Sequence, residues 1–184
     1  TKRKDIAKST CNLFIQEGFV NISISQIAKV AGIGKGTIYE YFKNKEDIVF
    51  ELMSCLQEDY DPKLELNLKE SINTKQKVIH LFKIFLDDDE TIQTQRKIYK
   101  EFLAIYLSNP SDEIIEYHLK LKEKYSLILL DILKSAIKNG EISELAVEFI
   151  PSLIATAEGF FITNENSKKQ IIDYIDNLFI LLKK

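Results

Sequence analysis

The sequence predicts an all-α fold, and three observations support this. Apolar side chains recur at spacings of three and four along most of the chain, which is the period of a helix packed on one face. The 184 residues contain only six glycines and three prolines, too few turn residues for a sandwich or barrel of short strands. A hydrophobic content of 45% is enough to build a sizeable core.

The first two predicted helices lie within the first 31 residues. Apolar and small residues at Ile6, Ala7 and Phe14 predict an amphipathic helix over about 5–17, which stops at Gly18. Ser23 and Gln26 then stand three apart before an apolar run, which is a capping box. We therefore expect a second helix over 24–31, ending at Gly32.

A short third helix is predicted over about 35–41. Gly34 is its N-cap, and this residue offers no side-chain acceptor to the first amides of the helix. A fourth helix begins after Asn44, because Asn44 and Asp47 repeat the three-residue capping spacing. It continues to about residue 59, before Pro62.

Further turn signals divide the rest of the chain into five helical segments. The signals are Asn73-Thr74, Asn109-Pro110-Ser111, Asn139-Gly140 and Asn166-Ser167. The predicted helices lie between them, over about 75–87, 91–108, 112–139, 144–163 and 168–183. Pro151 should either kink the helix that contains it or mark its true start.

Charge is distributed unevenly between the start of the chain and the remainder. Residues 1–47 carry eight basic and five acidic side chains, a net charge of +3, so the other residues carry −6 of the total of −3. A basic segment on an acidic body suggests a polyanion partner for that segment, although small local excesses are also common on solvated surfaces.

Composition also predicts where the protein works. No apolar run approaches the 18–20 residues or so that cross a bilayer, so we expect no membrane association. Cys11 and Cys55 cannot make a disulfide framework, which favours the reducing cytoplasm. We interpret both as small buried hydrophobic residues rather than as a redox switch.

We expect no catalysis, because no catalytic constellation is visible. His80 and His118 each stand without a cysteine or carboxylate at ligand spacing, and no phosphate-binding glycine loop or metal motif is present. We therefore predict no catalytic residue, no metal site and no cofactor. The acidic run over 87–90 is interpreted as a solvated connector.

The second and third predicted helices, with the turn Gly32-Ile33-Gly34 between them, have the lengths and turn chemistry of a helix-turn-helix. Gly32 permits the left-handed backbone that ends the first of the two helices. Ile27, Ile38 and Phe42 provide a small core beneath them. The residues left exposed on the third helix suit a phosphate wall and base edges, and they are Lys35, Gly36, Thr37, Tyr39, Glu40 and Tyr41.

These residues resemble a known family. The order and spacing of Gly18-Phe19, Ser23, Ile27-Ala28, Ala31-Gly32, Lys35-Gly36-Thr37-Ile38-Tyr39, Tyr41-Phe42 and Lys45-Glu46-Asp47 are similar to the N-terminal DNA-binding domain of TetR/AcrR-type transcriptional regulators. The resemblance covers about the first 55 residues. Gly34 replaces the usual serine cap, Tyr41 a common histidine, and Glu40 a neutral or aromatic residue. Glu40 could accept a hydrogen bond from cytosine or repel nearby phosphates.

The resemblance implies a homodimer with an N-terminal three-helix DNA-binding domain over 1–47, packed on a larger ligand-binding and dimerisation domain over 48–184. Two third helices would enter successive major grooves of a pseudo-palindromic operator, about 34–36 Å apart. By position, the residues that would face double-stranded DNA are Ser25, Gln26, Lys35, Gly36, Thr37, Tyr39, Tyr41 and Lys45. For Lys45, a solvated lysine at a helix start is the alternative.

The body is rich in aromatic and aliphatic residues that could form core, pocket or interface. The family implies an inducer pocket, for which we nominate Phe82, Phe85, Tyr99, Phe102, Tyr106, Tyr125 and Phe161. The family also places the last two helices in a dimer interface, here Ile150, Leu153, Ile154, Ala157, Phe160, Ile171, Ile175, Leu178, Phe179 and Leu182. Burial within one subunit is the alternative for about half of these positions.

The functional prediction is a ligand-responsive DNA-binding repressor, released from its operator by a small apolar or aromatic inducer. The alternative is a DNA-docking protein of the same fold whose body binds a protein partner. An enzyme acting on small molecules is the least favoured reading.

Overall fold

The computed structural model describes residues 1–108, 110–163 and 168–183. Within these ranges the chain forms helices and no strand, apart from one isolated bridge between Ile142 and Lys183. The all-α prediction is confirmed. The predicted turn residues Asn109, Asn166 and Ser167 lie outside the described residues.

The chain divides into two compact units. Unit 1 contains Thr1–Asp61 and Asp89–Ile114, and unit 2 contains Pro62–Asp88 with the described residues from Ile115 onward. The two units are defined only by which residues pack against each other, and not by function. The functional division at residue 47 therefore stays a prediction.

Unit 1 begins with two helices where the sequence predicts one. Helix α1 spans Lys2–Ser9 and α2 spans Cys11–Glu17. The break is at Thr10, whose hydroxyl and amide both donate to the Ala7 carbonyl, at 2.7 and 3.1 Å. A buried threonine that bonds its own backbone competes with the regular helix ladder, so the single predicted helix is interrupted here.

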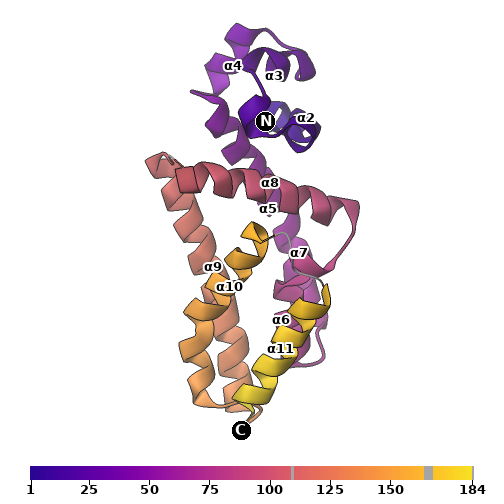
Figure 1. Ribbon diagram of the computed structural model, residues 1–184, viewed down its shortest axis with the longest axis vertical. Helices are drawn as coiled ribbons and strands as arrows, with labels where there is room; N and C mark the ends of the chain where they lie inside the picture. Colours follow the sequence, from indigo (N-terminus) through magenta and orange to yellow (C-terminus); the bar gives the residue numbers. More distant parts are fainter. Residues whose placement is uncertain (109, 164–167, 184) are drawn as a thin grey trace. The chain divides into compact units, whose positions relative to one another are not determined.

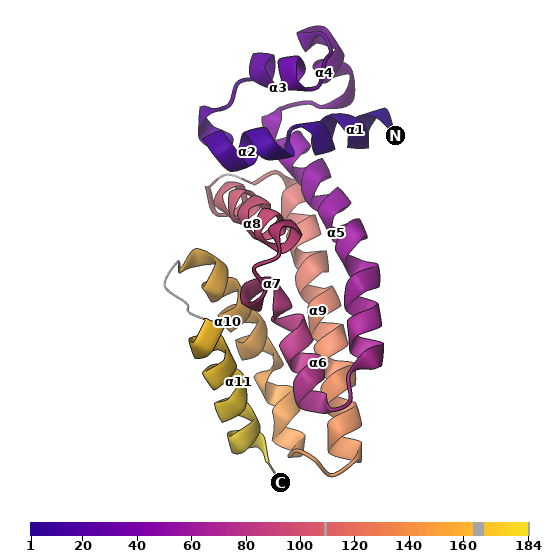
Figure 2. The same cartoon turned by 90° about the vertical axis from the view of Figure 1, so that its right-hand side faces the viewer.

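The remaining elements of unit 1 are η1 (Phe19–Asn21), α3 (Ile24–Val30), α4 (Lys35–Tyr41), the first part of α5 (Lys45–Glu70) and α8 (Glu90–Ser108). Helix α2 packs against α8, although the two are far apart in sequence (Figure 2). The core of the unit contains side chains that are no more than 2% exposed, including Phe14, Ile27, Ile38, Phe42, Ile48, Leu52, Ile98 and Phe102.

Helix α5 is longer than predicted, with Pro62 inside it. The sequence places its end near residue 59, but the helix continues to Glu70. A proline removes one backbone donor and does not by itself end a helix whose two halves are both packed. The boundary between the two compact units falls at this proline.

Unit 2 contains α6 (Thr74–Leu81), α7 (Lys83–Leu86), most of α9 (Asp112–Lys138), η2 (Glu144–Phe149), α10 (Ile150–Ile162) and α11 (Lys168–Leu182) (Figure 1). The single helix predicted over 75–87 is divided at Phe82, whose ring is buried among other aromatic rings. Pro151 lies in the first turn of α10, so it marks the start of that helix.

One stretch of unit 2 is more apolar than the sequence analysis expects. The segment Glu144–Ile162 consists of η2 and α10 taken together, and it is long and apolar enough to cross a membrane by length and composition. That prediction of no such run is therefore wrong. Only 22% of its most apolar window is buried within the chain. Length and composition alone are weak evidence for a membrane span, because apolar helices of other origin pass the same test.

Candidate nucleic-acid interface

Helices α3 and α4 form a helix-turn-helix with the predicted bounds, apart from one residue at the end of α3. Gly32 lies between them with φ of 67°, a backbone conformation that favours glycine. The Ile33 amide donates back to the Ala28 carbonyl at 3.0 Å, which closes the end of α3. Ile27 and Ile38 are fully buried between the two helices, so their angle is fixed by packing.

The start of α3 is fixed by the predicted capping box. The Ser23 hydroxyl accepts from the Gln26 amide at 3.3 Å, and the Gln26 side chain accepts from the Ser23 amide at 2.8 Å. Gln26 also donates to Glu17 at 2.9 Å. Gln26, a predicted DNA contact, therefore already has local partners, whereas Ser25 beside it is exposed.

Helix α4 presents one face to solvent. Ile38 is buried on the inner side, while Lys35, Gly36 and Glu40 are exposed. Tyr39 and Tyr41 are 52% and 36% exposed, unusually high for tyrosines packed in a core. Tyr39 is therefore on the exposed face, as the sequence analysis predicts. Thr37 is half-buried at the edge of the same face.

The polar side chains on this face are not used for hydrogen bonds within the described part of the chain. Among the described residues, no hydrogen bond or ion pair engages the side chains of Lys35, Thr37, Tyr39 or Glu40. A cation, two hydroxyls and a carboxylate on one short helix are the groups that contact phosphates and base edges. The face can therefore accept a nucleic acid without first breaking internal bonds.

Lys45, another predicted DNA contact, has a different environment. Its ammonium donates to the carbonyls of Phe19 at 2.6 Å and Ile22 at 2.9 Å, and lies 4.3 Å from the centre of the Phe19 ring. On the other side of this segment the Phe19 amide donates to Glu101 of α8 at 2.7 Å. Lys45 and Glu101 thus hold η1, which leads into the helix-turn-helix. A contact between Lys45 and a phosphate stays a prediction.

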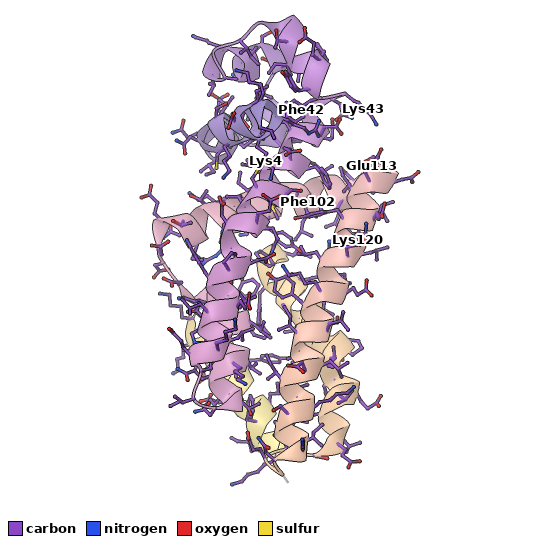
Figure 3. The ribbon with its side chains drawn as sticks, turned by 180° about the vertical axis from the view of Figure 1, so that it is seen from behind. Lys4, Phe42, Lys43, Phe102, Glu113 and Lys120 are labelled. Carbon is purple, nitrogen blue, oxygen red and sulfur yellow. The ribbon has the colours of Figure 1, made fainter. Side chains whose placement is uncertain are left out.

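Much of the basic charge near the chain start is paired within unit 1. Arg3, Lys4 and Lys8 of α1 form ion pairs with Glu51, Glu58 and Asp59 of α5. Lys43, just after α4, pairs with Glu113 at 3.5 Å (Figure 3). The charge count over 1–47 missed these pairs because every acidic partner lies outside that range. Lys35 on α4, by contrast, is exposed and has no ion pair among the described residues.

The nominated pocket residues fall in both compact units. Phe82, Phe85 and Phe161 belong to an aromatic cluster in unit 2, in which the Phe85 and Phe161 ring centres are 4.5 Å apart. Phe160 and Tyr174 complete this cluster, and neither was nominated for the pocket. Tyr99 and Phe102 stack in unit 1 with ring centres 5.9 Å apart. Tyr106 and Tyr125 are half-buried.

The nominated interface residues divide into two groups. Six of them are at most 8% exposed within the single chain and belong to its core, namely Ile150, Leu153, Ile171, Ile175, Leu178 and Leu182. Ile154, Ala157, Phe160 and Phe179 are half-buried. The large apolar side chains that are exposed on η2, α10 and α11 are different ones, namely Leu145, Phe149, Ile162, Ile172, Ile180 and Leu181.

Unit 2 also contains a charged cluster around the buried His118, which the sequence analysis did not predict. His118 is 2% exposed, and its Nε2 lies 3.1 Å from Glu158, whose other carboxylate oxygen accepts from Lys122 at 3.1 Å. Burial lowers the pKa of His118, against the opposing effect of the Glu158 carboxylate. No group of metal-ligating side chains is found among the described residues.

Comparison with known proteins supports the helix-turn-helix assignment. Residues 6–52 match the family described as bacterial regulatory proteins, tetR family. The chain is 31% identical over 148 residues to the fatty acid metabolism regulator protein of Bacillus subtilis strain 168, covering 78% of this chain and 72% of that protein.

Solved structures share the fold over nearly the whole chain. FadR of Bacillus subtilis in complex with stearoyl-CoA is similar with a TM-score of 0.65 and 24% identity, covering 98% of this chain and 97% of that one. A TetR-family transcriptional regulator from Cytophaga hutchinsonii is similar with a TM-score of 0.77 and 17% identity, covering 98% and 94%.

Proposed function

Because the chain belongs to the TetR family of bacterial transcriptional regulators, we propose that it is a repressor that binds operator DNA as a homodimer and leaves it when an apolar ligand binds. The observation that carries the proposal is the solvent face of α4. Lys35, Thr37 and Tyr39 stand on that face without internal partners, while Ile38 anchors the helix from behind.

In this proposal some side chains of α4 would position the protein by binding phosphates, and others would read the bases. Lys35 and the tyrosine hydroxyls of Tyr39 and Tyr41 suit phosphate oxygens, because cations and hydroxyls on a groove wall fix the register of a protein on DNA. Thr37 can offer its hydroxyl to a base edge and its methyl group to a thymine. Gly36 lets the backbone of α4 approach closely.

For the ligand we propose a long-chain acyl compound. The Bacillus subtilis relative is named a fatty acid metabolism regulator, and FadR is described in complex with stearoyl-CoA. The cluster of Phe82, Phe85 and Phe161 in unit 2 supplies aromatic surface of the kind that lines apolar ligand sites. A ligand acts as an inducer only if it prefers the state that does not bind DNA.

Footprinting of the DNA flanking the gene tests this function directly. We expect protection of an inverted repeat whose half-sites are about one helical turn apart, the spacing that two symmetric recognition helices impose. Stearoyl-CoA should abolish the protection, and coenzyme A without an acyl chain should not. Absence of sequence-specific protection would contradict the proposal. Protection that responds to neither compound would overturn the acyl ligand and favour a protein partner.

A further inference from the structure

The recognition helix α4 ends without a compensating charge of its own. Its last turn contains no basic residue, and Phe42, at the C-cap, closes only one backbone bond, to Ile38. Carbonyl groups at a helix C-terminus carry partial negative charge and need donors from elsewhere. The Tyr41 carbonyl receives such a donor from Arg3 of α1, through the guanidinium Nη1.

Arg3 makes two further contacts that fix its position. Its Nε donates to Glu51 of α5 at 2.6 Å, and the Glu51 side chain is only 14% exposed. Its guanidinium carbon lies 4.4 Å from the centre of the Phe42 ring, which is 2% exposed. A planar group with donors on several edges can make these contacts together, whereas a lysine ammonium cannot. Three elements, α1, α4 and α5, therefore meet at one side chain.

The neighbouring cations of α1 provide a natural comparison. Lys4 and Lys8 pair with Glu58 and Asp59 of α5, and among the described residues no hydrogen bond or ion pair joins either lysine to α4. In both cases the pKa of the lysine is raised, chiefly by the hydrogen bond to its carboxylate partner. Lys4 thus resembles Arg3 in charge and in pairing with α5, and differs because no hydrogen bond joins it to the recognition helix among the described residues.

We propose that Arg3 is a positioning residue for the recognition helix, which sets the placement of α4 for base reading without touching DNA itself. The inference rests on the proposed DNA binding and goes beyond it, because it assigns a role to a residue outside the helix-turn-helix. Displacing α4 should weaken contacts to base edges more than contacts to phosphates, since base readout depends on a few well-aligned side chains.

The test compares Arg3→Ala and Arg3→Lys with Lys4→Ala, each titrated against the footprinted operator and a scrambled duplex. Arg3→Ala should reduce operator affinity about tenfold relative to Lys4→Ala, with equal affinity for scrambled DNA. Arg3→Lys should lie closer to Arg3→Ala than to the wild type. A mere loss of folded protein would lower both affinities equally, so the ratio of the two is the diagnostic readout.

The salt dependence separates positioning from direct contact. Because Arg3→Ala and Lys4→Ala remove the same charge, their slopes of log affinity against log salt should be equal. A slope for Arg3→Ala that is shallower by about 0.9 would mean that Arg3 neutralises a phosphate, which would overturn the inference. Equal operator affinities for the two variants would overturn it as well.

Two further measurements keep the test decisive. Glu51→Gln removes a negative charge, so simple electrostatics predicts tighter DNA binding, whereas loss of the Arg3 anchor predicts weaker operator binding. Amide exchange without DNA should quicken over residues 38–42 in Arg3→Ala and not in Lys4→Ala. Unchanged exchange contradicts the role of Arg3 even if the wild type binds no operator, an outcome that would separately defeat the proposed function.

Discussion

Thr37 is the residue at which base reading can be tested with the least disturbance of the fold. It lies half-buried at the edge of the exposed face of α4, and its hydroxyl has no partner among the described residues. Thr37→Ala should weaken operator binding by about 1 kcal/mol, the usual net value of a hydrogen bond, and leave thermal stability nearly unchanged. Fluorescence anisotropy with labelled operator measures this. Wild-type affinity in the variant would remove Thr37 from the interface.

Lys45 supports the fold of the DNA-binding region whether or not it meets DNA. Its ammonium is held by the Phe19 and Ile22 carbonyls, so Lys45→Ala leaves two half-buried acceptors without their donor. We expect a loss of about 1–3 kcal/mol in the free energy of unfolding. Denaturant titration measures it, with the exposed Lys29→Ala as control. If the two variants are equally stable, the carbonyl contacts contribute nothing.

Individual residues of the site show which of its features could be predicted from the sequence and which could not. The solvent face of α4 was predictable, because Ile38 and Phe42 define an inner side by helical spacing alone. The role of Lys45 was not, because its carbonyl partners come from a segment about 25 positions earlier and carry no side-chain signal. Arg3 was missed for the same reason, since its acceptor is the backbone of Tyr41.

Among the elements, the ends of helices that have a local chemical cause were predicted well. Ser23 with Gln26, and Asn44 with Asp47, cap their helices as the spacing predicts. Interruptions that depend on tertiary packing were missed. The break at Thr10 arises from a side-chain bond to the backbone, and the break at Phe82 places a ring in a cluster built by distant residues. The prolonged α5 shows that one proline is a weak stop signal.

Helices α9 and α10 are joined by a pair whose protonation should affect stability. Burial lowers the pKa of His118 in the folded chain, so the unfolded chain binds more protons as the pH falls below about 6.5. Stability should therefore decrease on going from about pH 7.5 to about pH 5.5. Melting curves should show a smaller decrease for His118→Gln, which keeps a donor towards Glu158.

His80→Gln is the matched control for this pH effect. Burial also lowers the pKa of His80, with Lys83 adding to the effect, but His80 is not in the cluster with Glu158. If His118→Gln and the wild type lose the same stability over this pH range, another group accounts for the pH dependence and the buried pair is not its source.

For the whole molecule, the exposed apolar side chains of unit 2 bear on dimerisation. Ile172 and Ile180 of α11 are 42% and 71% exposed and stand eight positions apart, on one side of the helix. Ile172→Glu with Ile180→Glu should give a folded monomer by sedimentation, because the charges meet the partner rather than the core. Leu178→Glu, at a residue that is 8% exposed, should instead unfold the chain. A double variant that remains a dimer would place the interface elsewhere.

The fold of the whole chain was predictable as a class, and its division into compact units was not. Helical periodicity identifies nearly every helix, but α8 packs on α2 across more than seventy positions of sequence, a contact that no local pattern encodes. The nominated pocket residues Phe82 and Phe102 accordingly fall in different units. Periodicity identifies a buried face without specifying which other helix covers it.

The central claim is that α4 binds a specific DNA sequence through its exposed polar face. Titrating wild type and Lys35→Ala against operator and scrambled DNA over a range of salt concentrations tests it most directly. We predict a linear fall of log affinity with log salt, a slope shallower by about 0.9 for Lys35→Ala, and an operator preference of at least about a thousandfold. Binding that is indifferent to salt, or equal for the two duplexes, would contradict the claim.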